Sequence, residues 1–128
     1  MTATDHAVEL IRAAALAASD KLATDLVAFD VSEQLAITDA FLLATGANDR
    51  QVRAIVEEIE DKLRELDAKP IRREGHRDGR WVLLDFGDVV IHVQHSEERE
   101  FYALERLWRD CPVIDLPAEI SPPAAPPA

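Results

Sequence analysis

The sequence predicts a single α/β domain in which helices pack on a mixed five-stranded sheet. Three observations lead to this prediction: helical apolar periodicity recurs in two long segments, short apolar runs lie between and after them, and turn-forming dipeptides join the last runs. Helices alternating with strands, followed by a meander, are typical of such a layered fold. A chain of 128 residues, 48% of them hydrophobic, can bury one core without a disulfide or a metal.

Two segments have the apolar spacing of amphipathic helices. The first is Asp5–Leu22, and the second carries an apolar stripe over Val52–Leu66. Asn48 is expected to cap the second helix, with Gln51 reaching back from its third position. The pattern stops before Pro70, as proline requires.

Five short runs are expected to form strands. Ala40–Thr45 does not alternate, which predicts burial on both faces, and the run after Pro70 is charged like an edge strand. Asp78-Gly79 and Gly87-Asp88 are expected to form tight hairpin turns. The expected strands are Asp25–Val31, Ala40–Thr45, Pro70–Glu74, Arg80–Phe86 and Val89–Gln94.

After the strands we expect a last helical region and then a tail. Ser96 is the expected cap, and the region closes at Cys111-Pro112. The side chains of this helical region that are expected to face the sheet are Phe101, Leu104, Leu107 and Trp108. The ending SPPAAPPA has no aromatic to bury, so we assign 1–116 to the domain and 117–128 to a disordered Pro/Ala-rich tail.

Composition narrows the class of function. Twenty-five acidic and fourteen basic residues give a formal charge of −11, which disfavours direct nucleic-acid binding and favours a basic protein partner. A single cysteine, a first segment without the order of a secretory signal, and no apolar run near the roughly 20 residues of a membrane span predict a cytoplasmic protein.

Catalytic and metal-binding interpretations find little support. Nucleotidyl transfer would use a Gly-Ser turn and paired carboxylates, but the turn here is Gly46-Ala47 and Glu58 and Glu60 point apart on a helix. Asp85 and Asp88 straddle a turn, where a structural role is the alternative to an acidic pair. We therefore predict no enzymatic activity, with a residual nucleotidyltransferase as the alternative.

The remaining metal-type and nucleophile-type residues are also isolated. His92 and His95 are three apart on a strand and face opposite sides, so a zinc site lacks its ligand set. Cys111 has no activating base nearby in the sequence and is expected to be a buried or idle thiol. No metal or other cofactor is predicted.

The hairpin Arg80–Val93 is the best candidate for a binding surface. Its first strand places Trp81, Leu83 and Asp85 on one face and Val82, Leu84 and Phe86 on the other. A central strand covered on both faces is one alternative. The other is a partly open face with an aromatic centre and an acidic rim, which suits protein binding.

Two strings in the sequence resemble the ribosomal silencing factor family, RsfS or Iojap-like: WVLLDFGD, and the pattern F-Y-x-L-E-R-L-W near the end. The likeness extends over about residues 5–108. It implies a nucleotidyltransferase-like α/β fold without the catalytic carboxylates. It also implies a translational repressor that binds the large ribosomal subunit and sterically blocks small-subunit joining when nutrients are limiting.

The resemblance further implies a partner and a contact surface. The partner would be the universally conserved large-subunit ribosomal protein numbered fourteen, and the free protein is expected to be able to form a homodimer. Phe86 replaces a common Tyr or Leu, which puts a hydroxyl hydrogen bond in doubt. The carried-over contact residues are Trp81, Asp85, Phe86, Gly87, Asp88 and Val90. A protein-interaction module with another partner is the second alternative.

Overall fold

A computed structural model describes residues 2–120 of the chain. It confirms an α/β fold with a mixed five-stranded sheet. The likeness of this fold to that of nucleotidyltransferases stays a prediction. The helices are α1 (Asp5–Asp20), α2 (Asp49–Glu65) and α3 (Ser96–Tyr102), followed by the short 3₁₀ helix η1 (Leu104–Arg106). The strands are β1 (Thr24–Asp30), β2 (Ala40–Gly46), β3 (Arg72–Glu74), β4 (Trp81–Asp85) and β5 (Val89–His95).

The sheet has the order β1-β2-β5-β4-β3. The β2–β5 pair is parallel, and the three other neighbouring pairs are antiparallel. Helix α2 lies between β2 and the β3–β5 meander in the sequence and supplies the crossover that a parallel pair needs. The central strands β2 and β5 are therefore flanked on both sides, and β3 is an edge.

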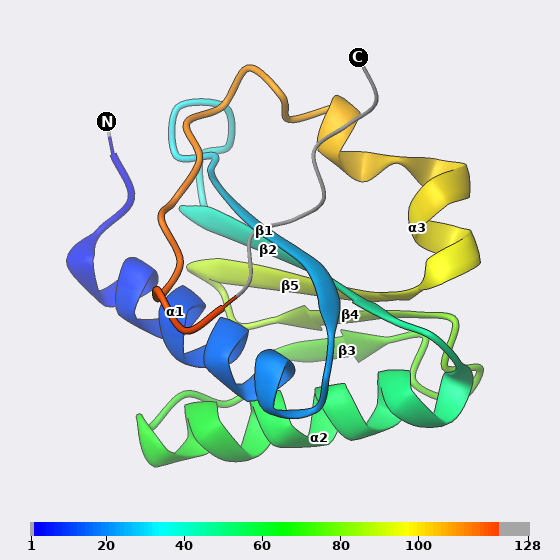
Figure 1. The fold of residues 1–128 in the computed structure, drawn as a ribbon. Helices are drawn as coiled ribbons and strands as arrows, with labels where there is room; N and C mark the ends of the chain where they lie inside the picture. Colours follow the sequence, from blue (N-terminus) through cyan, green and yellow to red (C-terminus); the bar gives the residue numbers. More distant parts are fainter. Residues whose placement is uncertain (1, 121–128) are drawn as a thin grey trace.

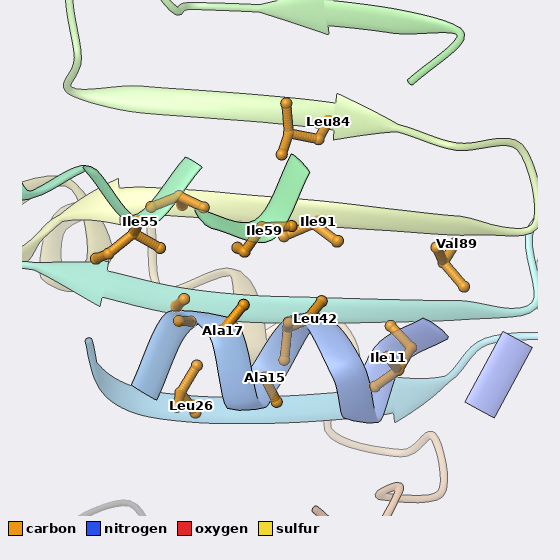
Figure 2. Close-up of a cluster of buried hydrophobic side chains, with 14 of the residues drawn as sticks. Ile11, Ala15, Ala17, Leu26, Leu42, Ile55, Ile59, Leu84, Val89 and Ile91 are labelled. Atoms are coloured by element: carbon orange, nitrogen blue, oxygen red, sulfur yellow. The ribbon is translucent and has the colours of Figure 1, made fainter. Parts of the chain in front are cut away.

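Helices α1 and α2 lie together on one face of the sheet (Figure 1). Their apolar stripes meet the inward side chains of β1, β2, β4 and β5 in the main core, where Ile11, Ile59 and Leu84 are fully buried (Figure 2). Removing this much apolar surface from water is the chief stabilising contribution. Other fully buried members of this core are Leu42, Ile55, Leu63, Val82, Ile91 and Val93.

The predicted cap of α2 is confirmed in its main bond. The side chain of Asn48 accepts a hydrogen bond from the amide of Gln51, at 2.8 Å. The side-chain oxygen of Gln51 reaches back to the amide of Ala47, at 2.6 Å, one residue before the position that a capping box predicts. Its side-chain nitrogen donates to the carbonyls of Lys21 and Leu22, so this residue also joins the end of α1 to the start of α2.

The opposite face of the sheet is covered only in part by residues 2–120. Over β1, β2 and β5 a second apolar cluster forms, in which Phe29, Phe41 and Val90 pack under Leu104 and Trp108. Helix α3 lies on this side of the sheet, away from α1 and α2 (Figure 1). The part of the face over β4 is less covered, since Trp81, Leu83 and Asp85 are all partly exposed.

The segment after the second cluster closes the β1 edge. Asp30 donates its amide to the carbonyl of Pro112, and Ile114 donates to the carbonyl of Ala28, so 112–114 pair with β1. The chain then follows α1, and Ile120 is only 9% exposed in the main core. Ordered packing therefore continues beyond the boundary that we placed at residue 116, and residues 121–128 of the predicted tail lie outside the described residues.

Several predicted local features are wrong. Leu22 has a left-handed φ of 64° and is 77% exposed, so α1 ends before it. The predicted tight turn at Asp78-Gly79 is part of a longer loop, 75–80. In this loop Gly75 has a φ of 79°, and its Cα lies so close to the carbonyl of Trp81 that a side chain would not fit.

The last helix also differs from its prediction. His95 rather than Ser96 is the cap of α3, because its Nδ1 accepts from the amide of Glu97, at 3.1 Å. Phe101 is 80% exposed and Leu107 is 72% exposed, so neither belongs to the predicted inner side, whereas Leu104 and Trp108 do pack inward. Within 2–120, no helix is long and apolar enough to span a bilayer.

Candidate functional site

The β4–β5 hairpin presents Trp81, Leu83 and Asp85 on the sheet face that α1 and α2 do not cover. Their cross-strand neighbours on β5 are Gln94, His92 and Val90, in that order. The alternate side chains Val82 and Leu84 are fully buried on the helical face. Strict alternation along β4 therefore separates a core face from a partly open one, which is the second of the two alternatives that the sequence left open.

Trp81 is held by two aromatic neighbours. Its indole nitrogen donates a hydrogen bond to Nδ1 of His92, at 3.1 Å. The ring of Tyr102 from α3 lies with its centroid 4.8 Å from that of Trp81. A large side chain fixed in this way loses little conformational entropy when a partner binds.

His92 is the buried support beneath Trp81. Its ring is also edge-on to Phe41, with centroids 5.5 Å apart. Burial lowers the pKa of His92 to about 4, so the ring is neutral at physiological pH. Because Nδ1 accepts from Trp81, the proton of the neutral ring lies on Nε2.

The tip of the hairpin is a two-residue turn, as predicted. Gly87 has a φ of 90°, and Phe86 donates its amide to the carbonyl of Val89, at 2.9 Å. Asp85 accepts from the amide of Gly87 through Oδ1, at 2.8 Å, and its Oδ2 lies 3.8 Å from Nη2 of Arg72. The carboxylate of Asp85 therefore shapes the turn and pairs with a cation.

Asp88 is exposed at this tip, and its backbone connects the hairpin to the loop before β2. Its carbonyl accepts from the amides of Asp39 and Ala40, at 2.7 and 3.2 Å. The turn is thus fixed from both sides while the carboxylate points to solvent. This geometry agrees with the structural interpretation of Asp85 and Asp88.

Two of the six predicted contact residues do not belong to the open face. Phe86 is partly buried and packs against the core on the helical side, away from Trp81. Val90 is 9% exposed and is covered in the second apolar cluster. The open face and tip comprise Trp81, Leu83, Asp85, Gly87 and Asp88.

Sequence reasoning missed three residues that surround Trp81. Leu83 alternates with Trp81 and could have been included on that ground alone. His92 and Tyr102 contact Trp81 through the β4–β5 register and the path of α3, which local patterns do not fix. Phe101 extends this surface, since its ring lies 5.0 Å from that of Tyr102.

Residues considered for metal binding or catalysis have other roles in the structure. His92 supports Trp81 and His95 caps α3, and among residues 2–120 no three His, Cys, Asp or Glu side chains gather as a metal would require. Cys111 is buried, and burial together with nearby Asp110 raises the pKa of its thiol, which keeps it protonated.

The fold and this face define a small α/β domain that carries a partly covered, aromatic-centred surface on its sheet. A model of the family described as "Ribosomal silencing factor during starvation", RsfS, matches residues 4–128. The chain belongs to this family of ribosomal silencing factors.

Relatives and solved structures agree with that membership. The ribosomal silencing factor RsfS of Bacillus subtilis is 44% identical over 107 residues, which cover 84% of this chain and 91% of the relative. A crystal structure from Chromobacterium violaceum has a TM-score of 0.76 and 34% identity, covering 86% of this chain and 92% of that one. A structure from Bacillus halodurans has a TM-score of 0.74 and 40% identity, with coverage of 84% and 98%.

Proposed function

We propose that this protein is a translational repressor that binds the large ribosomal subunit and sterically prevents the small subunit from joining it. The observation that carries the proposal is family membership over nearly the whole chain, combined with an aromatic face that the fold leaves partly open. The family is named for silencing ribosomes and not for a catalysed reaction. Action under nutrient limitation, in the cytoplasm, is part of the proposal.

The proposed contact surface is the open face of the hairpin. Trp81 supplies a fixed aromatic anchor, Leu83 adds apolar area beside it, and Asp85 and Asp88 form an acidic rim. An aromatic centre with a charged rim is the usual composition of a protein-binding site. Phe86 packs behind this surface on the helical side, and Val90 lies beside it on the same face, under the second apolar cluster.

The proposed partner is the large-subunit ribosomal protein numbered fourteen, as the resemblance to the family implies. A formal charge of −11 is complementary to a basic ribosomal protein and would raise the rate of association. The same charge opposes direct contact with RNA, so protein contact is favoured over rRNA contact. No cofactor is required for steric exclusion.

The same face is proposed to mediate self-association in the free protein. Light scattering with and without an equimolar amount of large subunits is the measurement. We expect a dimer that is lost when large subunits are added, because both contacts would use Trp81. A monomer at every concentration would remove this part of the proposal.

A subunit-joining assay tests the proposed function. Large subunits are incubated with the protein, small subunits are added, and the particles are separated on a sucrose gradient. We expect the protein in the large-subunit fraction and a reduced peak of joined ribosomes. Joined ribosomes that form to the same extent with and without the protein would show that steric exclusion is wrong.

A further inference from the structure

Helix α3 is attached to the sheet in an unusual way. It carries its aromatic side chains outward, with Phe101 80% and Tyr102 47% exposed. The residue that it buries is Arg99, which is charged. Burial of an amphipathic face normally supplies most of the stability of a helix in a protein, and α3 has little of it.

Charged hydrogen bonds take the place of apolar contacts. Arg80, just before β4, donates to Glu98 at 3.0 and 2.9 Å and to Glu97 at 3.0 Å. Arg99 donates to the hydroxyl of Thr45 on β2, at 2.9 Å, and to Glu105 beyond the helix, at 3.2 Å. The ion pairs of Arg80 are partly exposed, so each is weak and is screened by salt, whereas the bond from Arg99 to Thr45 is buried.

A polar side chain lies in the layer beneath the helix. Gln94 on β5 is flanked by Thr45 on β2 and Trp81 on β4, and it is fully buried. Among residues 2–120, neither its amide oxygen nor its amide nitrogen has a hydrogen-bond partner. A buried amide without partners destabilises the closed arrangement relative to one in which water reaches it.

The helix also ends at a strained residue. Ala103 joins α3 to η1 with a φ of 45° and a ψ of 52°, in the left-handed region that an alanine rarely adopts. At the other end, the cap His95 is the last residue of β5. The segment therefore begins at a side-chain cap and ends at a residue with a strained backbone.

We propose that α3 is a hinged cap that opens while the rest of the fold stays closed, and that its opening uncovers Trp81. Closed, the cap places Tyr102 against the indole. In the open state, water reaches the amide of Gln94 and Ala103 can leave the left-handed region. One side of Trp81 then becomes free for contact. The opening is a property of the free protein, and only its use in partner binding rests on the proposed function.

Hydrogen exchange measured by NMR on the free full-length protein tests the cap. Arg80→Gln removes the bonds to Glu97 and Glu98, so we expect the amides of α3 and the indole N–H of Trp81 to exchange about fivefold faster. Arg77→Gln makes the same charge change on an exposed side chain in the preceding loop and should alter neither rate. Amides of α2 should be unaffected by both changes.

A second variant is expected to act in the opposite direction. Gln94→Met keeps the shape of the side chain but removes the unpartnered amide, so α3 should exchange about tenfold more slowly and the melting temperature should not fall. Faster exchange or a lower melting temperature would mean that the amide is satisfied in the closed state, and the proposal would be wrong. Arg80→Gln rates equal to wild type would also overturn it. Neither result depends on whether ribosomes are bound.

Discussion

Trp81 is the side chain on which the proposed surface depends. Its indole is fixed by a bond to His92 on β5, which does not involve α3, and the side chain remains partly exposed. Anchors at interfaces are often aromatic residues of this kind, held in their bound geometry before the partner arrives. Trp81 is thus held in place by its hydrogen bond to His92 while part of its ring remains accessible to a partner.

Replacing Trp81 with Ala should weaken binding to large subunits by about 2 kcal/mol or more, which is roughly 30-fold. The reason is the loss of the aromatic anchor. Binding is measured by titration with purified large subunits, and circular dichroism checks that the variant is folded. Leu22→Ala, on an exposed residue just after α1, is the control. A folded Trp81 variant with unchanged affinity would remove Trp81 from the contact surface.

His92 makes stability depend on pH. Its pKa is about 4 when folded and about 6.5 when exposed, so below pH 6.5 the unfolded chain binds a proton that the folded chain does not. This contribution is fully present above about pH 6.5 and is lost as pH falls towards 4. A difference of this size corresponds to about 3 kcal/mol.

The variant His92→Gln keeps an acceptor for Trp81 but does not titrate. Urea unfolding at pH 7, 5.5 and 4.5 should show a smaller loss of unfolding free energy in this variant than in wild type. His76→Gln, at an exposed position, should follow wild type. If wild type and His92→Gln lose stability in parallel over this range, His92 is not the group responsible.

At the scale of elements, the β4–β5 hairpin depends on its turn. Gly87 needs its left-handed φ of 90°, and a Cβ there would lie 3.2 Å from Cδ1 of Ile71. Gly87→Ala should therefore lower the unfolding free energy by about 1–2 kcal/mol in urea titration. Asp88→Ala, at the exposed neighbouring position, should change it by less than about 0.5 kcal/mol. Equal effects would mean that the turn tolerates a side chain at Gly87.

The elements also differ in how far the sequence could predict them. The Gly87-Asp88 turn and the cap at Asn48 depend on local chemistry, and both are present. The loop at 75–80 was mistaken for a tight turn because the close approach of Gly75 to the carbonyl of Trp81 is a tertiary contact. The outward orientation of Phe101 follows from how Arg80 and Arg99 hold α3, which periodicity does not reveal.

Across the whole molecule, alternation along β4 predicted which side chains share a face, and the structure shows that Val82 and Leu84 are on the fully buried one. It did not predict that Val90 would be covered, because the cover comes from residues after α3 that return over the sheet. Nor did composition indicate that Ile120, beside a Pro/Ala-rich end, would join the core. Both misses involve the path of the C-terminal segment.

That path leads to a prediction on stability. A chain that ends at Leu116 should unfold with a free energy about 2 kcal/mol lower than a chain that ends at Ile120, because it lacks the buried isoleucine. Thermal and urea unfolding of the two truncated chains measure the difference. Equal stabilities would mean that residues 117–120, including Ile120, contribute nothing to the free energy of unfolding.

In the proposed function, the open face of the β4–β5 hairpin contacts one protein of the large subunit. A photo-crosslinking amino acid placed at Asp88, on the exposed tip, tests it most directly, with Lys62 on the exposed side of α2 as the control position. After irradiation with large subunits, we expect a crosslink from position 88 to the ribosomal protein numbered fourteen and none to it from position 62. A crosslink to that protein from position 62 alone, or from position 88 only to other proteins or to rRNA, would contradict the claim.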